Sequence, residues 1–191
     1  VLYANAGGWN PSSAVGVPVA DRPLLDRWML GELHAVVRDV TSALEAFDTA
    51  AAGRRLTTFI DDLSNWYVRR SRRRFWDGPS SSDGASAFAT LYECVTTLTL
   101  LLAPFVPFVT DYVWGVLRRA GAPESVHLTD FPVADESLID AELSDQMRAV
   151  IEDSHATVFR SLQQMLVETL RGEWEKERAR HEHRKRYLAE Q

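Results

Sequence analysis

Large apolar residues recur every three or four positions through most of this chain, which is the spacing of an α-helix with one buried side. The first such segment has Asp21 as its N-cap and Pro23 in its first turn, and it continues to Phe47. A short extended segment is expected at 125–132. Comparable patterns predict further helices over 49–76, 85–103, 107–119 and 140–150. The sequence therefore predicts an all-α helical bundle.

Turn-forming residues separate these helices. Asp48 is placed to cap the second helix, and Asp77-Gly78-Pro79 ends it before a loop rich in serine and glycine. Pro104 and Pro107 must kink or restart the third helix, because each lacks a backbone N–H and crowds the preceding turn.

Composition divides the chain into three parts. Residues 1–20 contain several glycines and prolines and are predicted to be an irregular lead-in. Residues 21–150 carry the helical bundle. Residues 151–191 differ, because both lysines of the chain lie there and few large apolar side chains follow Leu170. We interpret this last part as a solvated helical extension, with a boundary near residue 150.

The overall composition is that of a globular protein with an acidic balance. Hydrophobic residues make up 46% of the chain, enough for a sizeable core, and the formal net charge is −6. The single cysteine, Cys94, lies in an apolar run and is expected to be a buried thiol in a reducing compartment. We find no signal-peptide pattern, and prolines interrupt the longest apolar stretch, 98–109. We therefore expect a soluble, cytoplasmic protein with no membrane partner, which can contact nucleic acid only through a local basic patch.

One segment stands out against this acidic balance, because five arginines occupy six positions from Arg69 to Arg74. On a helix they lie three and four residues apart, and each like-charge pair costs roughly 0.2–0.5 kcal/mol. A negative partner must offset this repulsion. Neither Asp61 nor Asp62 has an arginine three or four residues away, so the partner must come from elsewhere.

Two interpretations of this cluster remain open. Arginines at the end of a helix complement its dipole and pair with acids on neighbouring helices. Alternatively, guanidinium groups bind phosphates in bidentate fashion, and the flanking aromatic rings stack on bases. The flanking aromatics that offer such rings are Trp66, Tyr67, Phe75 and Trp76.

No constellation of residues in the sequence predicts catalysis or metal binding. His181 and His183 are two residues apart, a poor spacing for metal ligands on a helix. The pairs Asp61-Asp62 and Asp135-Glu136 are adjacent, so their carboxylates point to different faces of a helix. The sequence lacks a P-loop, a nucleophile elbow and a dinucleotide fingerprint. We predict no catalytic residues, no metal ligands and no cofactor for this chain.

Several motifs, in order, resemble those of isoleucyl-tRNA synthetases. The long motif Asp61-Asp62-Leu63-Ser64-Asn65-Trp66-Tyr67-Val68-Arg69-Arg70-Ser71-Arg72-Arg73-Arg74-Phe75-Trp76 is the one specific for this family. The motif Leu101-Leu102-Ala103-Pro104-Phe105-Val106-Pro107-Phe108 contains a block shared with valyl, leucyl and methionyl relatives. The others are Leu2-Tyr3-Ala4-Asn5, Leu25-Asp26-Arg27-Trp28, Ser125-Val126-His127-Leu128 and Asp135-Glu136-Ser137-Leu138-Ile139-Asp140. The resemblance covers residues 1–150, and residues 151–191 do not resemble the continuation expected for the family.

This resemblance implies the α-helical bundle that follows the catalytic domain and docks the anticodon stem-loop of isoleucine-specific tRNA. The HIGH and KMSKS signatures of the catalytic domain are absent from this sequence. We therefore expect a non-catalytic part of a ligase whose whole chain uses ATP and magnesium, with the catalytic domain as a partner in the same chain. The residues predicted to bind tRNA are Asn65, Trp66, Arg69, Arg70, Arg72, Arg73, Arg74 and Trp76.

The resemblance leaves the role of each arginine open, since some of them can instead bond to neighbouring helices or to the catalytic domain. The alternative function is a helical protein-interaction module whose basic patch binds an acidic partner.

Overall fold

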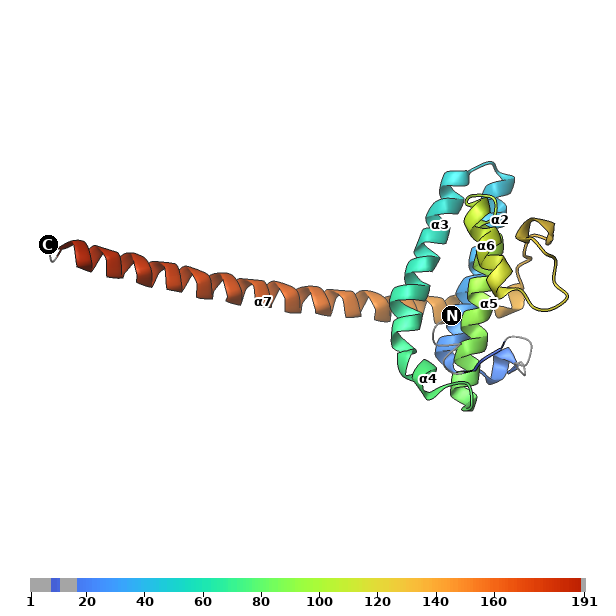
Figure 1. The fold of residues 1–191 in the computed structure, drawn as a ribbon, viewed down its shortest axis with the longest axis horizontal. Helices are drawn as coiled ribbons and strands as arrows, with labels where there is room; N and C mark the ends of the chain where they lie inside the picture. The colour runs from blue at the N-terminus through green and yellow to red at the C-terminus, as the bar shows by residue number, and fades with distance from the viewer. Residues whose placement is uncertain (1–7, 11–16, 190–191) are drawn as a thin grey trace. The chain divides into compact units, whose positions relative to one another are not determined.

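Most residues are α-helical in the computed structural model of the chain. The structure describes residues 8–10 and 17–189, and for 177, 179 and 181–189 it describes the backbone alone. The predicted lead-in falls largely on residues 1–7 and 11–16, outside the described residues. The described part contains no strand, so the all-α prediction is confirmed (Figure 1). The elements are η1 (Val19–Asp21), α2 (Leu24–Glu45), α3 (Thr49–Asp61), η2 (Asp62–Val68), α4 (Arg72–Asp77), α5 (Ser82–Leu102), α6 (Pro107–Leu117), η3 (Val126–Leu128), η4 (Glu136–Leu138) and α7 (Ala141–Ala189).

Helix α2 lies at the centre of the bundle, packed against both α3 and α5 (Figure 1). It begins at Leu24 with Pro23 at the N-cap, so the prediction of Asp21 as the cap was wrong. Asp21 instead ends the 3₁₀ turn η1, and Arg22 is extended because the residue before a proline is disfavoured in the helical region. Most of the predicted apolar stripe lies in the core of the bundle, through Trp28, Met29, Leu33, Val36, Val37 and Val40. The predicted end at Phe47 was wrong, because α2 ends at Glu45 and Phe47 is 93% exposed.

The predicted helix over 49–76 is interrupted. Its start is confirmed, because Asp48 Oδ1 accepts a hydrogen bond of 2.8 Å from the Ala51 amide. After α3, however, the chain widens into the π-helical segment η2, and Ser71 leaves the helical region before α4 begins. A π-helical turn holds more residues than an α-helical one, so it rotates the side chains that follow it. Gly78, with a φ of 78°, ends α4 as predicted.

Helices α5 and α6 form the other side of the bundle. The Ser81 side chain accepts the Gly84 amide at 3.0 Å, so α5 begins at Ser82, three residues before the predicted start. Pro107 occupies the first turn of α6, as expected for a restarted helix. Arg118 is extended, so α6 ends two residues before the predicted end.

Helix α5 is long and apolar enough to cross a membrane by length and composition alone, with a mean hydropathy of 1.4. It packs against α2, α4 and α6 and buries Phe88, Cys94 and Leu101. Because a core helix of a bundle meets the same criterion, this is weak evidence for a membrane span.

The segment after α6 is held by one carboxylate. Asp111 Oδ1 accepts hydrogen bonds from the Ser125 hydroxyl at 2.5 Å and from the Val126 amide at 3.1 Å. The hydroxyl and then the amide hold the pKa of Asp111 below its usual value. The predicted extended segment at 125–132 is correct for the backbone of Ser125 and Thr129, but the 3₁₀ turn η3 lies between them.

The chain divides into two compact units, Val1–Asp145 and Gln146–Gln191. The Asp140 side chain accepts the Leu143 amide at 2.9 Å at the start of α7. The helix predicted from 140 is confirmed and continues to Ala189, and most described side chains after 146 are exposed. The predicted boundary near residue 150 stays a prediction.

Candidate nucleic-acid interface

The arginine cluster is divided between the protein interior and the solvent. Arg74 and Phe75 follow Ser71 by three and four residues, so the three side chains face the same way, toward the bundle. Ser71 and Phe75 are buried, and the Arg74 side chain is 14% exposed. Arg72, Arg73 and Trp76 share the opposite, exposed face of α4. The same helix therefore presents one arginine inward and two outward.

Arg74 is fully engaged by protein oxygens. Its Nη1 and Nη2 donate to the two carboxylate oxygens of Asp26 at 2.6 and 2.7 Å, a bidentate pair. Its Nε donates to Asp83 Oδ1 at 2.8 Å. Burial opposes the charged form, but the hydrogen bonds and charge of Asp26 raise the pKa of Arg74 above its ordinary value. For Arg74, these contacts favour the structural interpretation over phosphate binding.

The carboxylate of Asp26 joins four elements of the bundle. It lies on α2, is fully buried, and accepts further hydrogen bonds from the Tyr67 hydroxyl of η2 at 2.8 Å and the Ser86 hydroxyl of α5 at 2.7 Å. Burial and then the charge of Asp26 raise the pKa of Tyr67, which keeps its hydroxyl protonated as a donor. A buried charge is stabilised only when its hydrogen-bonding capacity is met, and here four donors meet it. The network therefore fixes where α4 lies on the bundle.

Four arginines of the cluster are exposed, and Arg70 is the one of these that contacts the protein, over the Trp66 ring. The side chains of the others, Arg69, Arg72 and Arg73, make no hydrogen bond or ion pair with any residue in the described part of the chain. Nothing in the described protein therefore offsets their mutual repulsion by direct pairing. A guanidinium in this situation can bind an external anion without first breaking a bond to the protein.

The other predicted tRNA-binding residues differ in what they can offer. Trp76 is 68% exposed, so its ring is open to a stacking partner. Trp66 is only 8% exposed, and the Arg70 guanidinium lies 4.4 Å from its ring centroid, so Trp66 is a poor platform for a base. Asn65 is exposed, and its Nδ2 donates to Asp61 Oδ1 at 2.5 Å.

No group of three or more potential metal-ligating side chains occurs among the described residues. Two of the histidines instead contact backbone groups. His34 Nδ1 accepts the Asp135 amide at 3.1 Å, and His127 Nε2 lies 3.3 Å from the Pro107 carbonyl oxygen.

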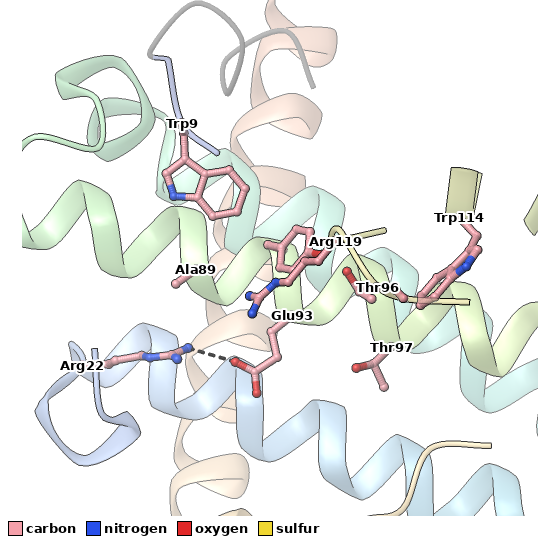
Figure 2. Close-up of a pocket in the computed structure, with 10 residues that line it drawn as sticks. Trp9, Arg22, Ala89, Glu93, Thr96, Thr97, Trp114 and Arg119 are labelled. Carbon is pink, nitrogen blue, oxygen red and sulfur yellow. Dashed lines mark hydrogen bonds and ion pairs between the residues drawn. The ribbon is translucent and has the colours of Figure 1, made fainter. Parts of the chain in front are cut away.

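Sequence reasoning missed a second feature, a pocket of about 350 Å³ between the N-terminal segment, α5 and the end of α6 (Figure 2). Its walls come from residues as far apart as Trp9, Tyr92 and Arg119. No local motif joins these positions, so only the folded chain reveals the pocket.

Comparison with known proteins shows the family of this chain. Residues 26–172 match the family described as the anticodon-binding domain of tRNA ligase, and the chain belongs to this family. The match extends beyond residue 150, where the resemblance was expected to end.

The chain is similar to several isoleucine–tRNA ligases, and the resemblance found in the sequence is confirmed. It is 66% identical over 151 residues to that of Thermobifida fusca, covering 78% of this chain and 14% of that protein. It is 54% identical over 162 residues to that of Streptomyces coelicolor, covering 82% and 15%, and 44% identical over 156 residues to that of Thermus thermophilus, covering 80% and 15%. The chain thus spans about one seventh of the length of these relatives.

Proposed function

We propose that this chain binds the anticodon stem-loop of isoleucine tRNA as the recognition part of an isoleucine–tRNA ligase. The observation that carries the proposal is the set of three exposed arginines without a protein partner among the described residues, Arg69, Arg72 and Arg73. They occur in a chain of the anticodon-binding family, and its similarity to isoleucine–tRNA ligases supports the choice of tRNA.

The arrangement supports a division of labour within the cluster. The outward guanidinium groups bind phosphates of the RNA backbone, which position the RNA without reading its sequence. Trp76, beside Arg72 and Arg73 on α4, stacks on an exposed base. Arg74 and Asp26 hold this helix in place before RNA arrives, which lowers the ordering cost of binding.

The proposal extends to the ligase as a whole. In the whole ligase, a catalytic domain elsewhere in the polypeptide attaches isoleucine to the tRNA with ATP and magnesium. The 191 residues of the present chain take no part in that chemistry. The ligase acts in the cytoplasm.

Binding measurements at several salt concentrations test the proposal. Fluorescence anisotropy with the stem-loop of isoleucine tRNA and with a non-cognate stem-loop should show tighter binding of the first. Replacing Arg72 and Arg73 by alanine should weaken binding and lower the slope of log K against log salt by about 0.7–0.9 for each phosphate that the variant no longer neutralises. Arg54→Ala, which removes an exposed arginine from α3, is the matched control.

Two results would contradict the proposal. One is equal affinity for both stem-loops and for an acidic peptide, which supports a protein-interaction module instead. The other is an unchanged salt slope in the double variant, which shows that these arginines do not contact phosphate.

A further inference from the structure

The pocket beside α5 has the dimensions of a small-molecule site. Its volume of about 350 Å³ lies at the lower end of the range of roughly 300–1,000 Å³ found for ligand pockets. Such a volume suits one flat ring system rather than several linked nucleotides. The close-up shows the residues that line the pocket, with Arg119 and Glu93 between Trp9 and Trp114 (Figure 2).

Aromatic rings form one wall of the pocket and are held in place by the fold. The Trp9 ring stacks on Phe88, with centroids 5.7 Å apart and planes at 19°, and it lies 5.4 Å from the Tyr92 ring. The Tyr92 hydroxyl donates to the Leu117 carbonyl at 2.8 Å, so this ring is anchored to the end of α6. Rigid rings of this kind offer stacking area at little entropic cost.

A planar cation stands over this wall. The Arg119 guanidinium lies 5.1 Å from the Tyr92 ring centroid, and it makes no hydrogen bond or ion pair within the described chain. Its donors and the face turned away from Tyr92 are therefore open to a ligand. Guanidinium planes and aromatic rings are the two surfaces on which proteins stack unpaired bases.

Two polar groups of the pocket, on Glu93 and Thr96, can accept a hydrogen bond from a ligand. Arg22 Nη1 donates to Glu93 Oε2 at 3.2 Å and to the Thr90 hydroxyl at 3.0 Å, which orients the Glu93 side chain, 37% exposed, at the pocket. The other carboxylate oxygen, Oε1, receives no hydrogen bond from any residue that the structure describes. The Thr96 hydroxyl is buried at the pocket and has no partner among those same residues. A fixed carboxylate selects an amino edge.

We propose that this pocket receives one unstacked base of the bound RNA, a base with an exocyclic amino group that donates to Glu93 while its ring stacks against Trp9 and Arg119. This inference rests on the proposed function, and it adds a base-reading site distinct from the phosphate-binding arginines of α4. The ligand is therefore a single adenine, cytosine or guanine of a single-stranded segment.

Abasic substitution in the RNA tests the proposal with the whole 191-residue chain. A set of stem-loops is prepared in which each loop nucleotide in turn lacks its base, and the affinity of each is measured. Besides the position whose base stacks on Trp76, one further abasic position should weaken binding of the wild type by about tenfold, as expected for the loss of one stacked base. In Trp9→Ala that position should lose its effect, because the base has nothing left to stack on.

A second variant keeps the test informative if the loss of Trp9 disturbs folding. Glu93→Gln preserves the size of the side chain but places an amide where the amino edge binds, and it should reduce the effect of the same abasic position. Arg54→Ala is the control and should keep the full tenfold sensitivity. Unfolding curves recorded in parallel establish that each variant is folded.

The outcomes separate this inference from the proposed function. If the stem-loop binds but every abasic position has the same effect in the wild type and both variants, the pocket takes no base and the proposed function stands. If the base identified lacks an exocyclic amino group, the assigned role of Glu93 is wrong and the inference falls. If the wild type binds no stem-loop at all, both the inference and the proposed function are overturned.

Discussion

Arg74 and Asp26 form a bidentate ion pair that joins α4 to α2, with nitrogen–oxygen distances of 2.6 and 2.7 Å and a fully buried carboxylate. Arg74, one of the five clustered arginines, therefore holds α4 against α2. The exposed arginines beside it are thereby held on a helix whose position is already set.

Removing Arg74 is expected to destabilise the fold far more than removing its neighbour. Arg74→Ala leaves the buried Asp26 charge without its main partner, and we expect a loss of about 3–5 kcal/mol in the free energy of unfolding. Arg73→Ala removes an exposed side chain, and its effect should stay within about 0.5 kcal/mol. Urea titrations followed by circular dichroism measure both. Equal losses would show that Arg74 does not support the bundle.

The Tyr67 hydroxyl is expected to contribute to the same network. Tyr67→Phe removes one of four donors to Asp26, and a hydrogen bond to a charged group contributes about 1.5–3 kcal/mol to stability. Tyr112→Phe is the control, because Tyr112 is 77% exposed. If the two variants unfold at the same urea concentration, the Tyr67 hydrogen bond carries no net stability.

Trp76 should affect RNA binding without affecting stability. Its ring is 68% exposed, so Trp76→Ala should leave the unfolding curve nearly unchanged. Loss of one stacked base should weaken stem-loop binding by about 5- to 150-fold, corresponding to about 1–3 kcal/mol. Tyr112→Ala, an exposed aromatic on α6, should bind like the wild type. A Trp76→Ala protein with wild-type affinity would exclude stacking on this ring.

Asp111 should make the stability depend on pH in the acidic range. Its pKa is lowered in the folded protein, so its contribution is present above the ordinary value of 3.8 and is lost as pH falls through the lower folded value. Asp111→Asn should therefore be less stable than the wild type near neutral pH, and the difference should shrink below pH 3.8. Urea unfolding of both proteins across this range measures the difference. When Ser125 is replaced by alanine, Asp111 loses a donor, so the further change Asp111→Asn should cost less stability at neutral pH. A difference between wild type and Asp111→Asn that stays constant with pH would contradict the assignment.

Cys94 should be unreactive in the native protein. Its side chain is fully buried, and burial raises the pKa of the thiol, which suppresses the thiolate that reacts. Labelling with a thiol reagent at neutral pH should proceed only at the rate of unfolding and become fast in denaturant. Rapid labelling under native conditions would mean that α5 opens locally.

Local features of the chain were predictable because their causes lie within a few residues. The apolar stripe of α2 follows from the three- and four-residue spacing of Leu33, Val36 and Val40. The start of α3 follows from the Asp48 side chain reaching an amide three residues on. The error at Asp21 has an equally local cause, since Pro23 directs Arg22 out of the helix. The π-helical segment was not predictable from spacing, because it accompanies the burial of Trp66 and Tyr67 against the other helices.

The sequence alone was sufficient for the helical architecture, the family resemblance and the existence of a cationic cluster that needs an anionic partner. Only the tertiary structure assigned that partner for Arg74, because Asp26 lies 48 positions earlier in the chain and meets it only when α2 and α4 pack together. The same holds for the pocket that gathers Trp9, Tyr92 and Arg119. Helical period and capping depend on neighbours in the chain, whereas ion pairs and cavities depend on which faces the packed helices bring together.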